Sequence, residues 1–247
     1  CKSRYGERVF FLSLLENVGF GRANNEGIKI AKGKNVFLLN PDTILLNNAV
    51  KILSEFLDNH INVAICGGNL YTKELEPIHS YLMYLPSLYS EVDQLFGERL
   101  SFRRYGNNLF FNHTEKPLNV GYVTGADMMI RKSVLDEAGY FDPDFFMYFE
   151  ETELTFRIRK MGYDVMSVPD ARIIHLEGQS VQLKEYRENM FLQSRRLYLR
   201  KTSRSRIIFL LCQIIYGINA LIHVVYFSSF RKERELLKIW KYRLKNF

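Results

Sequence analysis

The sequence predicts an α/β protein with a mixed, mostly parallel sheet and flanking helices, followed by a basic helical tail. Up to about residue 180, short apolar runs alternate with amphipathic stretches, as they do when helices cover a sheet. A chain of 247 residues can bury a core of that kind in one large domain. We therefore expect one domain over residues 1–181 and a helical, basic region over residues 182–247.

Apolar spacing predicts the elements of the first domain. A helix over residues 49–57 would place Val50, Leu53, Phe56 and Leu57 on one face. The apolar residues of the 73–118 stretch show no sustained helical or strand periodicity. We interpret this stretch as an irregular insertion with one short helix near residues 89–96. The earlier elements are predicted as a strand at 9–12, a helix at 21–31, and strands at 36–39 and 63–66. Regular structure is expected again at 122–131, 133–138, 151–161 and 164–168.

The formal net charge of +7 conceals two oppositely charged regions. Residues 195–247 carry 13 Lys and Arg against 2 Asp and Glu, so the rest of the chain is mildly acidic. Such a tail indicates contact with an anionic surface, either a membrane or a nucleic acid. The three cysteines, Cys1, Cys66 and Cys212, lie far apart, which favours reduced thiols in a cytosolic setting over a disulfide framework or a zinc site.

The turn Asn40-Pro41-Asp42 directly follows a short apolar run that is typical of a buried strand. Pro41 ends the strand because proline has no N–H for the ladder. Asp42 would then lie at the carboxyl end of the strand, the edge where open α/β sheets bind ligands. A cap for the following helix would explain the same residue, so the turn alone leaves both interpretations open.

Aromatic residues lead into a second acidic cluster that contains Glu150, Glu151 and Glu153. Carboxylates at a helix N-terminus compensate the helix dipole, which is the structural explanation. Neighbouring aromatic rings would also desolvate these groups, and desolvation raises a carboxyl pKa toward the range of a general base. The cluster by itself is compatible with both roles.

Two further stretches combine polar residues with strand ends or small residues. His175 ends an apolar run, and Asp42 follows another such run after two residues. His175 is either a structural residue or a residue that binds a ligand. Gly121 and Gly125 precede Asp127, and small residues there let the backbone approach a ligand or let a helix pack closely.

Five motifs follow one another along the chain: the segment from Glu16 to Gly27, Asn40-Pro41-Asp42, Gly125-Ala126-Asp127, Phe149-Glu150-Glu151, and His175 with Gly178 and Ser180. In this order, the motifs resemble those of the family 2 glycosyltransferases, and in particular the bacterial rhamnosyltransferases that build cell-surface polysaccharide. The resemblance covers about residues 5–200 and implies a glycosyltransferase-A fold with a nucleotide-diphosphate sugar as donor.

The resemblance implies that Asp42 binds Mg²⁺ or Mn²⁺, since its turn is a variant of the family's Asp-x-Asp motif. A hard cation prefers oxygen ligands and neutralises a diphosphate leaving group. Asn40 stands where the first carboxylate would be, so we expect it to lie beside the donor and to contact the metal ligands, not the metal itself. His175 would touch the metal or the diphosphate.

The family's catalytic base lies in a Glu-Asp pair after the aromatic run. Glu150 and Glu151 occupy that place here, with Glu151 at the aspartate position. Either carboxylate could deprotonate an acceptor hydroxyl for in-line attack on the anomeric carbon, which inverts its configuration. Glu153 is a fallback candidate.

The resemblance also implies binding residues on both sides of the cleft. Gly125 and Asp127 match the acceptor side. The donor side corresponds to the helix-opening segment with Asn17, Arg22, Asn24 and Asn25, although these four residues could instead be ordinary caps and surface.

This chain begins to match the family pattern about one strand-helix-strand unit after the point where the family members begin. Members begin with a strand bearing a Thr-Tyr-Asn-like turn and a second strand ending in Asp-Asn-x-Ser, and we find neither here. Because the chain starts at Cys1 without a methionine or a signal peptide, we expect an upstream piece. Missing strands would expose sheet edge and apolar helix faces, so we expect poor solubility and weak or no donor binding for this chain alone.

Residues 207–227 are uncharged and long enough to cross a bilayer. Basic flanks on both sides oppose a single span, and Gln213, Gly217, Asn219 and His223 dilute the apolar run. We favour an interfacial or re-entrant helix on the anionic cytoplasmic face of the plasma membrane, with a soluble-core helix as the alternative. No recognition motif accompanies the basic tail, so we expect no nucleic-acid partner.

The favoured function is a metal-dependent, inverting glycosyltransferase of bacterial cell-surface glycan synthesis. It would move rhamnose or another hexose to a polysaccharide or lipid-linked acceptor. A second hypothesis is a catalytically inactive, truncated relative that acts as a membrane-attached scaffold or remnant. A third is a nucleotide-sugar hydrolase that uses the same metal site with water as the acceptor.

Overall fold

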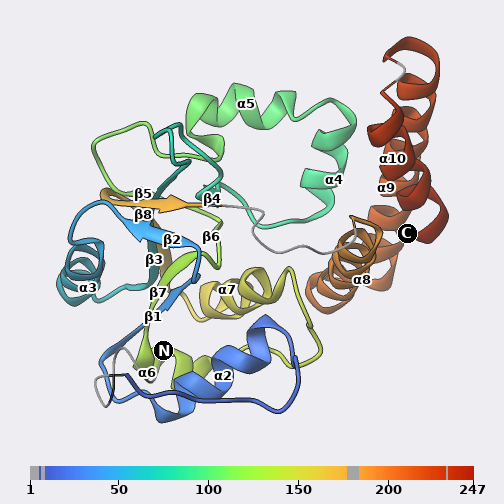
Figure 1. The fold of residues 1–247 in the computed structure, drawn as a ribbon. Coiled ribbons are helices and arrows are strands. Elements are labelled where there is room, and N and C mark those ends of the chain that lie inside the picture. The colour runs from blue at the N-terminus through green and yellow to red at the C-terminus, as the bar shows by residue number, and fades with distance from the viewer. Residues whose placement is uncertain (1–5, 7–8, 177–183, 232) are drawn as a thin grey trace.

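The computed structural model describes residues 6, 9–176, 184–231 and 233–247, which form a layered α/β unit with a helical layer beside it (Figure 1). The central sheet has the strand order β1-β7-β3-β8-β2, and β5 pairs with β8. A small second sheet joins β4 to β6. The strands are β1 (Asn35–Leu39), β2 (Thr43–Leu45), β3 (Val63–Tyr71), β4 (Tyr81–Leu82), β5 (Leu118–Asn119), β6 (Tyr122–Val123), β7 (Asp127–Arg131) and β8 (Asp164–His175).

The central sheet is mixed, as the sequence predicts. Strands β1, β3 and β8 run in the same direction, but only β3 and β8 are parallel neighbours. Strand β7 lies antiparallel between β1 and β3, and β2 lies antiparallel on β8. Three strands of the sheet therefore point in one direction, but most neighbouring strands are antiparallel to each other.

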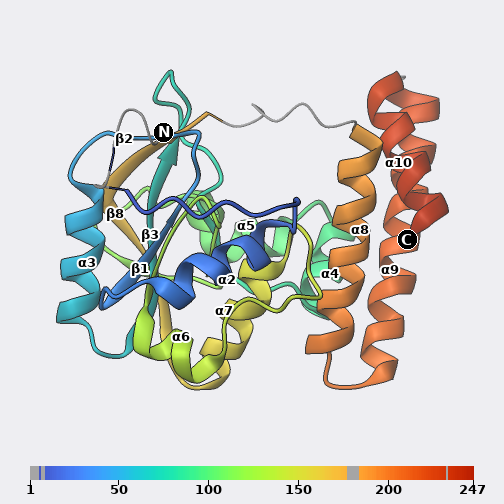
Figure 2. The ribbon, with the colours of Figure 1, turned by 60° about the horizontal axis from the view of Figure 1, so that its bottom comes forward.

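Helices cover both faces of the sheet (Figure 2). Helix α3 (Ala49–Asn59) covers one face and buries Ala49, Leu53 and Leu57, which follow one another at a four-residue spacing. Val50, predicted on that face, is 41% exposed because it lies one residue off this stripe. The other face is covered by α2 (Phe20–Ile30), α6 (Lys132–Ala138) and α7 (Glu150–Lys160).

The insertion at residues 73–118 is more regular than expected. Helix α4 (Leu88–Leu95) matches the short predicted helix, and it is followed by α5 (Arg99–Tyr105) and the 3₁₀ turn η2 (Gly106–Leu109). The buried carboxylate of Asp93 accepts hydrogen bonds from the backbone N–H groups of Leu100 and Ser101, at 2.9 and 3.0 Å. A side chain from the preceding helix therefore satisfies the N-terminus of α5, which local periodicity does not reveal.

The strand predicted at residues 9–12 is wrong. These residues have no regular secondary structure, and the side chains of Val9, Phe10, Phe11 and Leu12 are all exposed. A strand needs ladder partners for its backbone, and none of the described strands pairs with this segment. An apolar run of strand-like composition is therefore not sufficient to form a strand here.

Three C-terminal helices form a layer on the side of the molecule away from α3 (Figures 1 and 2). They are α8 (Lys184–Thr202), α9 (Arg206–Tyr226), which continues into the π-helical turn η3 (Phe227–Arg231), and α10 (Arg234–Asn246). Helix α9 contacts both α4 and α10, and α8 contacts α7. A buried cluster of Phe145, Tyr198, Leu199 and Cys212 joins this layer to the domain. The predicted boundary near residue 181 lies outside the described residues.

Candidate active site

Asn40, Asp42 and His175 converge at one edge of the sheet. Strand β2 follows Asp42 and pairs antiparallel with β8, which places Thr43 opposite His175. The Nε2 atom of His175 consequently lies 3.4 Å from Oδ1 of Asp42 and 3.4 Å from Nδ2 of Asn40. Residues that are far apart in the chain thus meet where strand ends meet, an arrangement compatible with the metal site that the family resemblance implies for Asp42 and His175. Gly178 and Ser180 of the same motif lie outside the described residues.

The chemistry of this group fits a divalent cation. The side chains of Asp42 and His175 are 25% and 15% exposed, so a ligand from solvent can reach both. In the described part of the chain, no three His, Cys, Asp or Glu side chains converge on one metal position. The protein would therefore supply an oxygen and a nitrogen ligand, and diphosphate oxygens or water would complete the coordination of Mg²⁺ or Mn²⁺.

The second acidic site begins at a strained turn. Tyr148 and Phe149 have φ angles of 70° and 65°, and consecutive non-glycine residues rarely adopt this left-handed region. Strain of this kind clusters at functional sites, where the surrounding structure holds it in place. Glu150 and Glu151 follow directly as the first residues of α7.

Burial changes the proton affinity of this carboxyl pair. Glu150 is only 4% exposed, and one of its carboxyl oxygens, Oε2, has no hydrogen-bond partner among the described residues. Burial, together with the charge of Glu151, raises the pKa of Glu150 to about 8. Burial also raises the pKa of Glu151 to about 7. Carboxyl groups that titrate near neutral pH can both accept and release a proton, which suits general-base chemistry.

Helix α2 holds the loop before this turn from one side. The backbone N–H of Phe20 donates to the carbonyl of Phe146 at 3.0 Å. Gly19 has a φ of +87°, and a Cβ at this position would lie 2.1 Å from that same carbonyl oxygen, so only glycine fits. The side chain of Asn25 exchanges two hydrogen bonds with the backbone of Phe141, at 2.8 and 2.9 Å.

Helix α8 holds the same loop from the other side. The hydroxyl of Ser194 donates to the carbonyl of Met147 at 2.7 Å. Lys201 forms ion pairs with Asp142 and Asp144. The geometry of the strained turn therefore depends on a helix that starts after the predicted catalytic domain.

The predicted donor-binding residues of the α2 region bond to the chain itself. Asn17 accepts a hydrogen bond from the N–H of Gly19 at 3.1 Å, and Asn24 donates to the carbonyl of Phe20 at 3.0 Å. Arg22 donates to the carbonyl of Pro143 at 2.7 Å. These contacts build the site, and a direct contact of Asn17, Arg22 or Asn24 with a donor stays a prediction.

The two predicted acceptor-side residues are packed within the domain. Asp127 is completely buried, and its Oδ2 accepts a 2.6 Å hydrogen bond from the N–H of Gly68. Burial raises the pKa of Asp127 to about 7. Gly125 lies against Phe20, where an added Cβ would be 3.2 Å from the ring. A direct acceptor contact by Asp127 would require the site to open, and that role stays a prediction.

Glu153 has a structural partner that sets it apart from Glu150 and Glu151. Its two carboxylate oxygens accept hydrogen bonds from Nε of Arg157 at 2.9 and 3.0 Å. Arg157 also donates to the carbonyl of Tyr140 at 2.7 Å, which ties α7 to the end of α6. A carboxylate neutralised in this way is a weaker candidate for the base than its two neighbours.

A pocket of about 460 Å³ adjoins the acidic site, and the sequence did not predict it. Tyr122 and Phe149 line it near α7, and residues of α4, α8, α9 and α10 line the rest. The long irregular stretch at residues 73–118, with its aromatic residues, is a sequence signal for this region, since such a stretch is usually a functional loop and we expected it to shape the acceptor side. Their convergence depends on the placement of the C-terminal helices.

The fold is that of the glycosyltransferase-A enzymes. One solved structure with this fold is GalNAc-T7 with UDP, GalNAc and Mn²⁺, at a TM-score of 0.54 and 15% identity over 94% of this chain and 42% of that chain. Another is the mannosyltransferase PcManGT from Pyrobaculum calidifontis with GDP-Man and Mn²⁺, at a TM-score of 0.53 and 11% identity over 95% of this chain and 67% of that one. At such identities the likeness shows the fold alone.

The chain belongs to glycosyltransferase-like family 2, whose family model matches residues 2–195. A similar curated protein is the N-acetylglucosaminyl-diphospho-decaprenol L-rhamnosyltransferase of Mycobacterium tuberculosis, 34% identical over 67 residues, which is 27% of this chain and 21% of the relative. The low-salt glycan biosynthesis hexosyltransferase Agl10 of Haloferax volcanii is 25% identical over 76% of this chain and 58% of its own length. The dTDP-rhamnosyl transferase RfbF of Shigella flexneri is 23% identical over 70% and 53%, respectively.

The matches confirm the predicted family and fold. They also show that this chain spans less than two thirds of the length of each of these three relatives.

Proposed function

We propose that this protein is a metal-dependent, inverting glycosyltransferase that moves rhamnose or another hexose from a nucleotide-diphosphate donor to a glycan or lipid-linked acceptor. The observation that carries the proposal is the approach of Asp42 to His175, at 3.4 Å, in a chain that also presents the buried Glu150 beside the half-buried Glu151. The names of the relatives support rhamnosyl or hexosyl transfer in glycan synthesis. GalNAc-T7 is in complex with UDP and Mn²⁺, and PcManGT with GDP-Man and Mn²⁺, which supports a nucleotide donor with a divalent metal for this chain.

The two acidic sites would divide the reaction between them. Asp42 and His175 would hold Mg²⁺ or Mn²⁺, whose charge stabilises the departing diphosphate. Glu151, or Glu150 beside it, would accept the proton of the acceptor hydroxyl as the hydroxyl oxygen bonds to the anomeric carbon. The bond from that carbon to the diphosphate breaks on the opposite face, so the configuration inverts.

A donor panel tests this function. Purified protein is titrated calorimetrically with dTDP-rhamnose, UDP-N-acetylglucosamine and GDP-mannose, with Mn²⁺, Mg²⁺ or EDTA. In protein that carries the family's first strand-helix-strand unit ahead of these residues, we expect binding of at least one donor that requires the metal, followed by transfer to an octyl glycoside acceptor with inverted anomeric configuration by NMR. This chain alone should bind donors weakly or not at all. Release of free sugar without transfer would favour the hydrolase hypothesis, and no donor binding with either metal would favour the inactive scaffold.

We also propose that α9 attaches the protein to the cytoplasmic face of an anionic membrane. The segment Arg206–Arg231 is long and apolar enough to cross a membrane. Only 28% of its most apolar 18-residue stretch is buried inside the protein, so most of that stretch is free to contact lipid. Its polar residues Asn219 and Tyr216 face inward. Its outer side carries an exposed apolar stripe: Ile207, Leu210, Leu211, Ile214, Ile218, Leu221, Ile222 and Val225.

Charge supports an interfacial position for α9. Arg204 and Arg206 lie at its N-terminal end, and Arg231 and Arg234 lie just beyond its C-terminal end. Basic residues at both ends are attracted to the same anionic leaflet. Flotation with vesicles that contain phosphatidylglycerol, compared with pure phosphatidylcholine vesicles, should show binding to the anionic vesicles; no flotation with either would contradict the proposal.

A further inference from the structure

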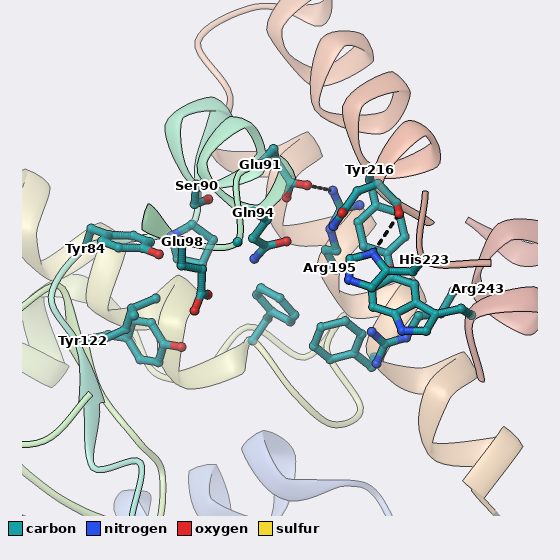
Figure 3. A pocket seen from close by; sticks show the side chains of 17 residues that line it. Tyr84, Ser90, Glu91, Gln94, Glu98, Tyr122, Arg195, Tyr216, His223 and Arg243 are labelled. Carbon is teal, nitrogen blue, oxygen red and sulfur yellow. Dashed lines mark hydrogen bonds and ion pairs between the residues drawn. The ribbon is translucent and has the colours of Figure 1, made fainter. Parts of the chain in front are cut away.

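The pocket beside α7 lies between the acidic site and the helix proposed to face the membrane. One end is lined by Tyr122 and by Phe149, the residue directly before Glu150. Burial and the nearby carboxylate of Glu151 both raise the pKa of the Tyr122 phenol, which indicates that this ring lies close to the carboxyl pair. The other end is lined by Tyr216 and His223 of α9 (Figure 3) and by Asn219 of the same helix.

The arginines that line this pocket are already neutralised. Arg195 pairs with Glu91 at 2.6 Å, and both side chains are only 5% exposed. Arg243 pairs with Glu188 at 2.6 Å. The guanidinium groups therefore offer little free positive charge, which argues against a phosphate group as the occupant of the pocket.

The remaining lining suits a neutral ligand rich in hydroxyl groups. The pocket is lined by aromatic side chains and by uncharged or acidic hydrogen-bonding groups, and in Figure 3 the labelled side chains of α4 and β6 face those of α8, α9 and α10. Sugar rings have apolar C–H faces that pack on aromatic rings and hydroxyl edges that bond to amides and carboxylates. The aromatic and hydrogen-bonding members are Tyr84, Tyr122, Phe149, Gln94, Glu98 and Asn219.

One buried group has an unsatisfied hydroxyl at this pocket. Tyr216 is 3% exposed, and its hydroxyl has no hydrogen-bond partner within the described residues. The ring itself is fixed, because the Arg195 guanidinium lies 3.8 Å from its centroid. A buried hydroxyl without a partner is costly, so a ligand that bonds to it would be stabilised.

We propose that this pocket binds the terminal sugar of a membrane-linked acceptor glycan and presents one of its hydroxyls to the carboxyl pair at the start of α7. This inference rests on the proposed glycosyltransferase function and specifies its acceptor site. The pocket lies beneath α9, about one helix diameter from the exposed apolar stripe, roughly 10 Å. An acceptor held in the membrane by a lipid could reach it without leaving the surface.

The chain provides its own reporter for this test. Trp240 is its single tryptophan, and it lines the pocket, stacked on His223 at 4.0 Å between ring centroids. The full chain is titrated with octyl β-D-glucoside, octyl N-acetyl-β-D-glucosaminide and octyl α-L-rhamnoside below their micelle concentrations, and tryptophan fluorescence is recorded. We expect a saturable change for at least one glycoside and none for octyl tetraethylene glycol ether, which has the same chain without a sugar.

Variants separate a sugar site from a general detergent effect. Tyr216→Phe and Asn219→Ala should each raise the glycoside Kd by about three- to tenfold, since each removes one hydrogen bond. Val50→Ala, at an exposed apolar position of α3 away from the pocket and from the apolar stripe of α9, is the control and should leave the Kd unchanged. An equal response to the ether, no response to any of the three glycosides, or unchanged affinity in both pocket variants would overturn the proposal.

The experiment also separates this inference from the proposed function. The titration contains no donor and no metal, so glycoside binding can be present in a chain that binds no donor. Conversely, donor binding that requires a metal, together with no glycoside response, would retain the transferase and reject this acceptor pocket.

Discussion

Helix α7 buries charged and hydroxyl side chains beneath a polar outer surface, whereas α9 buries its polar side chains beneath an apolar outer surface. In α7 the buried polar group includes Glu150, Thr152, Glu153 and Thr155. In α9 the inner face carries Tyr216 and Asn219, while branched apolar residues point outward. Helix α3 shows the ordinary arrangement, with Leu53 and Leu57 inside and charged residues outside.

The difference indicates what each helix faces. Buried carboxyl groups are unfavourable unless a partner or a function retains them, and at α7 they stand behind a strained turn next to a pocket. An apolar outer face is unfavourable in water, and at α9 it extends along the whole helix. We interpret α7 as shaped by catalysis and α9 as shaped by the medium outside the protein.

The largest expected effect concerns the carboxyl pair of α7. Glu151→Gln removes the proposed base with little change in shape, so we expect the transfer rate to fall by about 10²- to 10⁴-fold. Glu153→Gln is the matched control, since Glu153 already pairs with Arg157. It should lower the melting temperature but retain most of the rate per folded molecule. Equal losses in the two variants would argue against a catalytic role specific to Glu151.

The next effect concerns the metal. Asp42→Ala removes a proposed ligand, and we expect it to weaken metal-dependent donor binding at least roughly tenfold in calorimetric titration. Asp58→Ala removes an exposed carboxylate that pairs with Lys34 at 3.4 Å, and it should leave donor binding unchanged. Donor binding that is equally strong in Asp42→Ala would show that Asp42 is not a ligand.

A third prediction tests the outer face of α9. Ile214 and Ile218 are both exposed, and the double change Ile214→Glu with Ile218→Glu places two charges on that face. We expect it to reduce binding to anionic vesicles at least about tenfold, because each isoleucine loses its apolar burial. Val50→Glu places a charge on an exposed apolar position of α3 and is the control. If α9 instead covers another protein, the double variant will bind vesicles as the parent chain does.

The smallest expected effect is a pH dependence of stability. The pKa values of Glu150 and Glu151 rise from an ordinary 4.5 to about 8 and about 7 in the folded state, so the folded chain keeps protons that the unfolded chain loses. Stability should therefore fall as pH rises from about 4.5 to about 8. The reverse trend would contradict the burial of this pair.

Urea unfolding at pH 5 and pH 8.5 measures this dependence. Glu150→Gln should show a smaller decrease in the free energy of unfolding between the two pH values than the parent chain. Asp127 contributes in the same direction, since burial raises its pKa to about 7, and so Asp127→Asn is the variant that separates the two contributions. Transfer activity should rise with pH over the same range, because the base must be deprotonated.

Sequence reasoning succeeded where a local pattern carries the structure. The apolar run before Asn40 and the apolar spacing over residues 49–57 were sufficient to place a strand and a helix, although the buried face of the helix includes Ala49 and not the predicted Val50. The family resemblance placed Asp42 and His175 at one metal site, and the structure brings the two side chains within 3.4 Å of each other. The family order of motifs is also a property of the chain, and it predicted the fold.

It failed where distant segments decide the outcome. The run at residues 9–12 has strand-like composition but finds no ladder partner among the described strands. Helix α5 forms because the Asp93 carboxylate caps it from the preceding helix. Burial of Asp127 depends on the strands that flank it, whereas the family resemblance implied a place on the acceptor side of the cleft.

The sequence by itself determined the periodic elements, the strand-end position of Asp42 and the membership of the family, because these depend on spacing and turn chemistry within a few residues. The tertiary structure decided which carboxyl groups are desolvated, which face of α9 looks outward, and that side chains from Leu82 to Arg243 enclose one pocket. Desolvation and enclosure depend on atoms brought in from other parts of the chain, and no local pattern encodes their final distance.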